Sequence, residues 1–449
     1  MPKDTIKTDI VDFIHDLKFA DLPQAVQKQA ELCVLDLVGV GIGGATTPMS
    51  RIIRNHAVRT FGGGDGKVKM LFDGREASSA GAALAGGMTI DALDAHDGYN
   101  PAKGHVGCGV FPAALALAQE LGLKDGQEFM TSIAVGYELG SRLATALHAT
   151  TPDYHTSGAW VAVAVAGVGA RMMGLDRAAT RHALGIAEYH GPRSQMMRDI
   201  DFPTMVKDGS GWGAMAGVSA AWLAADGFTG APAITMEGDA AASYWADLGS
   251  RWLILEQYFK PYPVCRWAQA PIEAVLGLKR AHNLTSDMVD HIEIQTFHES
   301  VRLATNDPKT TEEAQYSTSY PCAVALVTGH VGLNEVMPAA FKNTEVARIS
   351  KGLVMNEDAY CNETFPAQRH ARAVLHLKDG RVLKSGITSP RWTAEAPPTE
   401  AELRAKFHDL AAPLVGADHA QAIEGATGAL LSGGTVPEFG DLVCQAGKS

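Results

Sequence analysis

The first 260 residues carry apolar side chains at the spacing expected for one helix after another. Over residues 22–38, apolar side chains recur every three or four positions and fall on one stripe: Val26, Ala30, Cys33, Val34 and Leu37. The same spacing predicts helices over residues 80–92, 110–121, 127–148, 177–187 and 209–225. Residues 155–173 are apolar on every side, and their length and small side chains favour a buried helix.

After residue 265 the pattern changes to a mixture of helices and strands. Residues 268–280, 314–328 and 343–351 have helical spacing, whereas HIEIQTF (291–297) alternates as a strand does. Two further strand-like runs, 373–378 and 381–387, flank Asp379-Gly380, a pair typical of a β-hairpin turn. Helical spacing returns over residues 400–410 and 419–431. We therefore predict a mainly α fold, with an all-helical domain (1–265 and 395–449) and an inserted α+β domain (266–394).

Composition and charge narrow the classes of partner. The chain has 449 residues, 46% of them hydrophobic, which excludes wholesale disorder. Its 38 Lys and Arg against 50 Asp and Glu give a net charge of −12, which argues against a nucleic-acid partner and a polybasic membrane anchor. We also expect no signal peptide and no membrane span. Six cysteines without a C-x-x-C pair favour reduced thiols, so we expect a cytoplasmic protein.

A G-x-G-x-x-G pattern runs from Gly39 to Gly44. A dinucleotide site needs a strand before this pattern and a helix after it. The residues before Gly39 have helical spacing instead, so we interpret the glycines as the end of a helix and predict no bound dinucleotide.

The segment DALDAHDGYNPAKGHVGCGVFP (91–112) gathers ionisable side chains immediately before an apolar helix. Such groups are costly beside a core unless they are paired or functional. We favour a loop that performs acid–base chemistry and binds an anion. A metal site formed by Asp94, His96, Asp97 and His105 fits no standard ligand spacing but stays open, as does a solvated loop that caps the helix.

Five further residues stand at positions suited to recognition of an anion. His155 and Lys207 each precede a small-residue helix, Lys260 and Arg266 belong to the proline-stiffened segment KPYPVCRWAQ, and Tyr320 stands at the start of a helix. A helix N-terminus offers N–H groups to an anion, arginine binds carboxylates in a bidentate manner, and a tyrosine can donate a proton. Purely structural roles are the alternative for each residue.

Together, in this order, these segments resemble the 2-methylcitrate dehydratase (MmgE/PrpD) family, which also includes cis-aconitate decarboxylase and iminodisuccinate epimerase. The resemblance runs through nearly the whole chain: residues 93–112, YHT (154–156), GLD (174–176), GIA (185–187), the Lys207 segment, GFTG (227–230), KPYPVCRWAQ and AQYSTSYPCAVAL. It implies a large all-helical domain with a smaller α+β lid domain, a homodimer, and activity without a metal or organic cofactor.

The resemblance also implies an active site between the two domains. Asp94, His105, His155, Lys207, Lys260 and Tyr320 fall on the family's active-site positions. We expect Asp94, His105, His155, Lys207 and Tyr320 to be catalytic. Lys260 would bind substrate together with Lys103 and Arg266, two cations that we select for their place in the sequence and not from the resemblance. The chain departs from the family at this site. Ala95-His96-Asp97-Gly98 stands where the family often has an Asp-Asp-Thr run, Val106 where a proline is common, and Gln269 where a histidine is common.

The expected function is that of a cofactor-independent lyase that dehydrates a hydroxylated di- or tricarboxylate of the 2-methylcitrate or citrate type. A histidine would remove the proton next to a carboxylate, while Lys207 and Lys260 hold carboxylates and stabilise the developing charge. A decarboxylase, an epimerase, a metal-dependent hydro-lyase and a non-catalytic polycarboxylate-binding protein remain alternatives.

Overall fold

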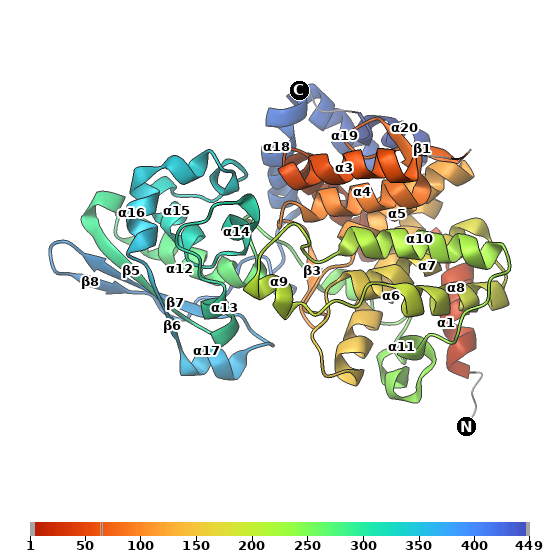
Figure 1. The fold of residues 1–449 in the computed structure, drawn as a ribbon, viewed down its shortest axis with the longest axis horizontal. Helices are drawn as coiled ribbons and strands as arrows, with labels where there is room; N and C mark the ends of the chain where they lie inside the picture. Colours follow the sequence, from red (N-terminus) through yellow and green to blue (C-terminus); the bar gives the residue numbers. More distant parts are fainter. Residues whose placement is uncertain (1–4, 63, 65, 446–449) are drawn as a thin grey trace.

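The helices of the first 260 residues form one lobe of the molecule, and the mixed helices and strands that follow form the other (Figure 1). The computed structural model describes residues 5–62, 64 and 66–445. A large helical N-terminal domain and a smaller α+β C-terminal domain confirm the predicted fold class.

Most of the helical lobe consists of the eleven α-helices that the structure describes before residue 240. Their bounds are α1 (Thr5–Asp16), α2 (Gln24–Gly44), α3 (Pro48–Phe61), α4 (Ser79–Asp91), α5 (Gly107–Leu121), α6 (Gly126–Thr150), α7 (Gly158–Met173), α8 (Arg177–His190), α9 (Met197–Asp201), α10 (Ser210–Ala225) and α11 (Ile234–Glu237). Two short antiparallel pairs accompany them, β1 (Lys67–Lys69) with β2 (Glu76–Ser78), and β3 (Gly98–Tyr99) with β4 (Gln257–Tyr258).

Helix α2 continues through the glycines that were expected to end it at residue 38, and stops at Gly44. The reason is close packing. A Cβ on Gly44 would lie 2.1 Å from the carbonyl oxygen of Thr89 in α4. The G-x-G-x-x-G pattern therefore lets two buried helices touch, and the prediction that it does not bind a dinucleotide agrees with its position inside a helix.

The α+β lobe contains a four-stranded sheet in the order β6-β5-β7-β8. Strand β5 (Val289–Thr296) pairs in parallel with β6 (Val354–Glu357) and antiparallel with β7 (Ala371–Leu377), which forms the predicted hairpin with β8 (Val382–Lys384). Gly380 has φ +91°, the left-handed conformation that the D-G turn requires. The helices of this lobe are α12 (Arg266–Ala281), α13 (His298–Arg302), α14 (Thr311–Tyr316), α15 (Tyr320–Thr328), α16 (Thr344–Lys351) and α17 (Ala359–Thr364).

The single helix predicted over residues 314–328 is wrong, because the chain breaks between α14 and α15 at residues 317–319. The Ser317 hydroxyl accepts hydrogen bonds from the backbone N–H groups of Ser319 (3.2 Å) and Tyr320 (3.0 Å) and donates to the carbonyl of Thr305 (2.8 Å). Serine hydroxyls compete in this way with helical hydrogen bonds.

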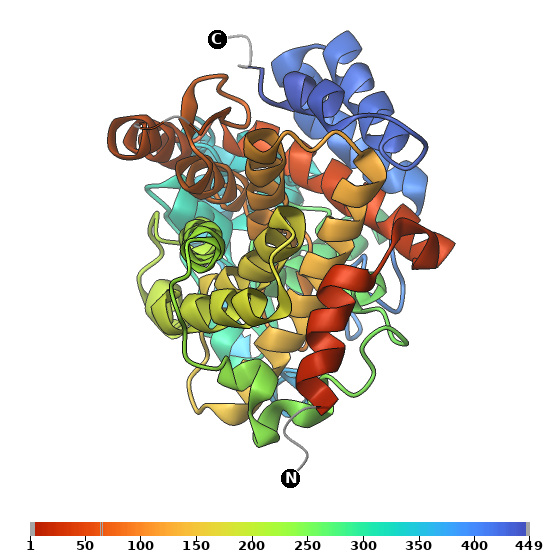
Figure 2. The same ribbon diagram turned by 90° about the vertical axis from the view of Figure 1, so that its right-hand side faces the viewer.

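The last three helices return to the helical lobe. They are α18 (Glu400–Val415), α19 (Ala417–Ala429) and α20 (Val436–Val443), and they pack against α2 and α5. Figure 2 shows them beside the first helices of the chain. This agrees with a helical lobe built from both chain ends, while the limits at 265 and 394 stay predictions.

Within the described part of the chain, no single helix is long and apolar enough to cross a membrane. Helices α2 and α3 pass that test only as a pair, and they are bent by 95° relative to each other.

Candidate active site

A tight loop between α4 and α5 forms the centre of the site. The N–H of Tyr99 donates to the carbonyl of Gly104 (2.9 Å), and Lys103, between them, has a left-handed backbone (φ +53°). This narrow hairpin brings His105 back beside Asp97, eight residues earlier. Five ionisable residues of the segment are buried: Asp91, Asp94, His96, Asp97 and His105.

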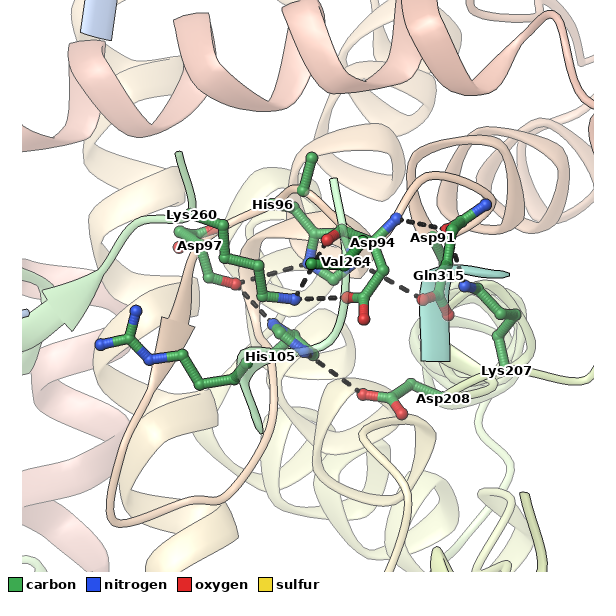
Figure 3. A network of polar contacts seen from close by, with 12 residues as sticks. Asp91, Asp94, His96, Asp97, His105, Lys207, Asp208, Lys260, Val264 and Gln315 are labelled. Carbon is green, nitrogen blue, oxygen red and sulfur yellow. Dashed lines mark hydrogen bonds and ion pairs between the residues drawn. The ribbon is translucent and has the colours of Figure 1, made fainter. Parts of the chain in front are cut away.

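Asp94 connects the two lobes (Figure 3). The Lys260 ammonium group, which follows β4, donates to one carboxylate oxygen of Asp94. From α14 in the other lobe, the Gln315 side-chain oxygen accepts hydrogen bonds from the Asp94 N–H (2.8 Å) and from the Lys207 ammonium group (3.1 Å). Gln315 therefore fixes both the backbone at Asp94 and the side chain of Lys207 in the helical lobe.

His105 is held from both sides. Its Nδ1 lies 2.6 Å from the backbone carbonyl oxygen of Asp97, which is best explained by an N–H donor at Nδ1. Its Nε2 lies 3.6 Å from a carboxylate oxygen of Asp208, and that oxygen accepts a hydrogen bond from Ser157 (2.8 Å). The imidazole therefore has a defined tautomer, with an acidic neighbour at its unprotonated nitrogen.

Burial and mutual charge shift the pKa values of these groups. Burial lowers the pKa of His105 to about 3, and His96 and Lys260 add to the effect. Burial raises the pKa of Asp208 to about 6 and that of Asp91 to about 6. Burial alone would raise the pKa of Asp94 too, but Lys260 and Lys207 outweigh it and hold that pKa well below its usual value. The site therefore combines a neutral imidazole with an ionised Asp94.

A small cavity of about 40 Å³ lies between the lobes, beside these residues. Asp94, His105 and Asp208 line it together with four cations, Lys103, Lys260, Arg266 and Arg369. The Arg266 guanidinium stacks 4.2 Å from the centre of the Tyr258 ring and donates to the carbonyls of Phe259 and Arg391. Aromatic stacking and backbone acceptors fix the orientation of this planar guanidinium group, as bidentate recognition of a carboxylate requires.

The structure brings together most of the residues predicted from the sequence. Asp94, Lys103, His105, Lys260 and Arg266 line the cavity, and Lys207 joins them through Gln315.

Two predicted residues are not among those that line the cavity. His155 stacks on His148, with ring centres 6.3 Å apart, and its backbone N–H donates to the His148 ring. The Tyr320 hydroxyl donates to the carbonyl of Glu335 at 3.0 Å, which gives this tyrosine a structural role.

Sequence reasoning missed four residues of the site: Asp208, Tyr258, Gln315 and Arg369. Asp208 had a signal, since it follows Lys207 directly in a glycine-rich segment. The other three come from segments far from the loop in sequence; Gln315 stands in the AQYSTSYPCAVAL segment quoted for the resemblance, whereas no local pattern marks Tyr258 and Arg369.

Sequence models of the MmgE/PrpD N-terminal domain and C-terminal domain match residues 8–246 and 262–430. The chain belongs to the MmgE/PrpD family. The C-terminal match includes α18 and most of α19, although both helices pack against α2 in the helical lobe.

Curated relatives match almost the full chain at low identity. The cis-aconitate decarboxylase-like protein oryM of Aspergillus oryzae is 23% identical, over 98% of this chain and 98% of its own length. Cis-aconitate decarboxylase of Aspergillus terreus is 22% identical, over 94% and 92%. The human cis-aconitate decarboxylase is 23% identical, over 91% and 88%.

Proposed function

We propose that this protein is a lyase acting on a di- or tricarboxylate of the citrate type. The observation that carries the proposal is the cavity between the lobes, where four cationic side chains surround an imidazole that is neutral and buried. Four cations exceed what a monocarboxylate needs, and they override locally the net charge of −12 that would otherwise repel an anion.

The reaction we favour is the elimination of water. His105 takes a proton from the carbon next to a carboxylate. The electron pair of the broken C–H bond forms the new C=C double bond as the C–O bond on the neighbouring carbon breaks. The proton, or one from the Asp208 carboxyl, then goes to the leaving hydroxide and gives water. Lys260 and Arg266 stabilise the charge that develops on the carboxylate, and Asp208 stabilises the imidazolium at 3.6 Å.

Decarboxylation is the second candidate, and the activity printed in the names of the relatives favours it. In that reaction the C–C bond to one carboxylate breaks, carbon dioxide leaves, and the electron pair takes a proton from His105 or Asp208. The same cations would stabilise the intermediate, so the geometry alone supports both reactions.

Substrate binding requires the lobes to move. The cavity of about 40 Å³ is far smaller than the roughly 300–1,000 Å³ of ordinary small-molecule sites. Asn100 of the loop joins the lobes here, because its side chain accepts from Arg369 and donates to the carbonyl of Ala367 (2.9 Å). These contacts must open to admit a polycarboxylate.

The test is product analysis by NMR in deuterated water with 2-methylcitrate, citrate, cis-aconitate and iminodisuccinate. Loss of water supports the first candidate, and loss of carbon dioxide supports the second. Deuterium exchange without either loss indicates an epimerase. Thermal stabilisation by a polycarboxylate without any product indicates a binding protein and contradicts the proposal of a lyase.

His105→Ala and Lys207→Ala should each lower turnover by about 10²-fold or more, because one removes the base and the other an ammonium group beside Asp94. Lys309→Ala is the matched control, since Lys309 is exposed and pairs only with Asp307 among the ion pairs described. Near-normal turnover in both site variants would refute these assignments.

The proposal includes a homodimer in the cytoplasm, as the family resemblance and the free thiols led us to expect. Light scattering on the purified protein measures the oligomeric state. A fluorescent fusion expressed in the source cells shows the location of the protein.

A further inference from the structure

Two of the cations that line the cavity, Lys103 and Arg369, form no ion pair with any carboxylate in the described part of the chain. The Lys260 ammonium group, by contrast, is neutralised by Asp94. The Arg369 side chain is only 5% exposed, and its Nε is buried without a hydrogen-bond partner among the described residues. A buried charge without a counter-ion is costly, so an anion that is not part of the chain explains this arrangement best.

The groups around Arg369 supply no negative charge. The titratable groups that act on it are Tyr154, Tyr258 and Cys265. Burial raises the pKa of Cys265 to about 12 and the pKa values of both tyrosines above 10, so all three side chains are neutral at pH 7. Burial also lowers the pKa of Lys103, and Arg369 lowers it further. Two like charges act on each other in this way when no acid lies between them.

Lys103 and Arg369 act on a different part of the cavity from the base. Four charged groups act most strongly on the pKa of His105: His96, Lys260, Asp208 and Asp94. Neither Lys103 nor Arg369 is among them, so an anion bound by these two cations lies away from the carbon that loses its proton to His105. In the proposed reaction Lys260 and Arg266 serve the carboxylate next to that carbon, which leaves Lys103 and Arg369 for another one.

A neutral amide is the present acceptor of Arg369. The Arg369 Nη1 donates to the Oδ1 of Asn100 and to the carbonyl of Pro366 (2.9 Å). The other end of the Asn100 amide donates to the carbonyl of Ala367 (2.9 Å). Hydrogen bonds to an ionised acceptor are roughly twice as strong as those to a neutral one. A carboxylate brought by a ligand should therefore displace Asn100 from Arg369 when the lobes open.

We propose that Arg369, together with Lys103, binds a second carboxylate of the substrate and so selects polycarboxylates over monocarboxylates. The inference rests on the proposed function, because it assigns a further carboxylate of the same substrate. The planar guanidinium group offers two parallel N–H donors to a carboxylate, which the Lys103 ammonium group cannot do. Arg369 contributes recognition and moves no proton. Its loss should therefore raise KM more than it lowers kcat.

The first experiment measures binding, so that it does not depend on turnover. Isothermal titration calorimetry uses the full-length protein and tricarballylate, a tricarboxylate without a hydroxyl group to lose. Arg369→Gln should weaken binding by about 10–100-fold, the range expected for hydrogen bonds to a charged group. Arg369→Lys should weaken it by less, because the charge remains and only the fork is lost. Arg381→Gln is the control, since Arg381 is exposed and pairs with Asp379 in the β7–β8 turn.

Asn100 offers a matched pair of variants with opposite expected results. Asn100→Asp places a carboxylate of the chain beside Arg369, so it should compete with tricarballylate and weaken binding by about tenfold or more. Asn100→Ala removes the competing acceptor and should bind tricarballylate at least as tightly as the wild type does. Both variants lose the hydrogen bond to Ala367, so a merely structural role of Asn100 would shift the two affinities in the same direction.

Steady-state kinetics on the substrate identified by NMR gives a second readout. Arg369→Gln should raise KM by about 10–100-fold and change kcat by less than about tenfold. Circular dichroism shows whether each variant folds. If Arg369→Gln does not fold, Arg369→Lys and the two Asn100 variants decide the question.

Equal affinity for tricarballylate in the wild type and in the folded Arg369→Gln variant overturns the inference. No binding of tricarballylate by the wild type overturns it too, as does weaker binding in Asn100→Ala than in Asn100→Asp. Binding that depends on Arg369 in a chain that turns over no polycarboxylate refutes only the lyase proposal. Turnover with a KM that does not change in Arg369→Gln refutes only this inference.

Discussion

Two buried lysine–aspartate pairs hold the loop after α4 from opposite sides. Lys260 pairs with Asp94 and approaches the Asp94 carbonyl at 3.5 Å, on the side of the cavity. Lys406 of α18 pairs with Asp36 of α2 at 2.6 Å and donates to the carbonyl of the next loop residue, Ala95, at 2.7 Å. By residue type and burial alone the two pairs are equivalent.

Their electrostatics differ. Burial lowers the pKa of both lysines, but Asp94 and Tyr258 outweigh it at Lys260 and raise that pKa above its usual value. At Lys406 burial prevails, and the pKa falls. Lys260–Asp94 is therefore held ionised by its neighbours, whereas burial disfavours the charged forms of both Lys406 and Asp36. A buried ion pair acts on a ligand only where its surroundings keep it charged.

The largest expected difference is in activity. Lys260→Met should lower kcat/KM by about 10³-fold, because it removes a fixed charge from the cavity. Lys406→Met should lower it by less than about tenfold, since it disturbs only the position of the loop. Steady-state kinetics on the substrate identified by NMR makes the measurement. Equal losses would show that the two pairs do not differ in function.

The second difference is in stability. Lys406→Met should lower the free energy of unfolding by about 3–5 kcal/mol, because Asp36 is left buried without its partner. The double variant with Asp36→Leu should recover most of that loss, since an apolar pair of similar volume needs no desolvation of charge. Urea denaturation followed by circular dichroism compares the three proteins. A double variant as unstable as Lys406→Met would contradict this explanation.

A buried carboxyl group outside both pairs gives the smallest effect and a dependence on pH. Burial raises the pKa of Asp199 to about 6 from its usual 3.8, although Lys207 opposes the shift. The folded state therefore binds the proton more tightly than the unfolded state, and Asp199 destabilises the fold as pH rises from about 4 to about 6.

Asp199→Asn should remove that penalty, because the amide oxygen still accepts from the N–H of Thr204. The gain should be at most about 3 kcal/mol at pH 8 and close to zero at pH 4. Melting temperatures of wild type and variant across this range test it, and a gain independent of pH would contradict the assigned cause.

The sequence predicted the fold well where periodicity decides it. Most of the longer helices, such as α2, α6, α7 and α10, follow from helical spacing, and β5 and the β7–β8 hairpin follow from alternation and one turn signal. Helices α3 and α20 and strand β6 were not predicted. The prediction failed where contacts between residues distant in sequence determine where a helix ends. Helix α2 reaches Gly44 with glycines because the Thr89 carbonyl leaves no room there for a side chain, and Ser317 breaks a helix because Thr305 accepts its hydroxyl.

The residues of the candidate site were predicted from the sequence where a local pattern marks them. The loop residues Asp94 and His105 stand out by the density of charge around them, and Lys260 and Arg266 by their rigid, proline-containing segment. Gln315 and Arg369 come from the other lobe, and only the folded chain shows their contacts with the site, although Gln315 stands in the AQYSTSYPCAVAL segment that carried part of the resemblance. His155 was selected for its place before a helix; it stacks on His148 and is not among the residues that line the cavity, so its catalytic role stays a prediction.

The junction between the lobes divides the site into two kinds of part. The groups that move protons, His105 and Asp208, belong to the helical lobe, whereas Arg266 and Arg369 belong to the segment that follows it. The two groups touch at few points, through the contact of Arg369 with Asn100 and that of Arg266 with Tyr258 and Phe259. A lineage can thus exchange the shape and charge of the acid that it recognises while it retains the machinery for breaking a bond, which gives such a scaffold wide scope for new substrates.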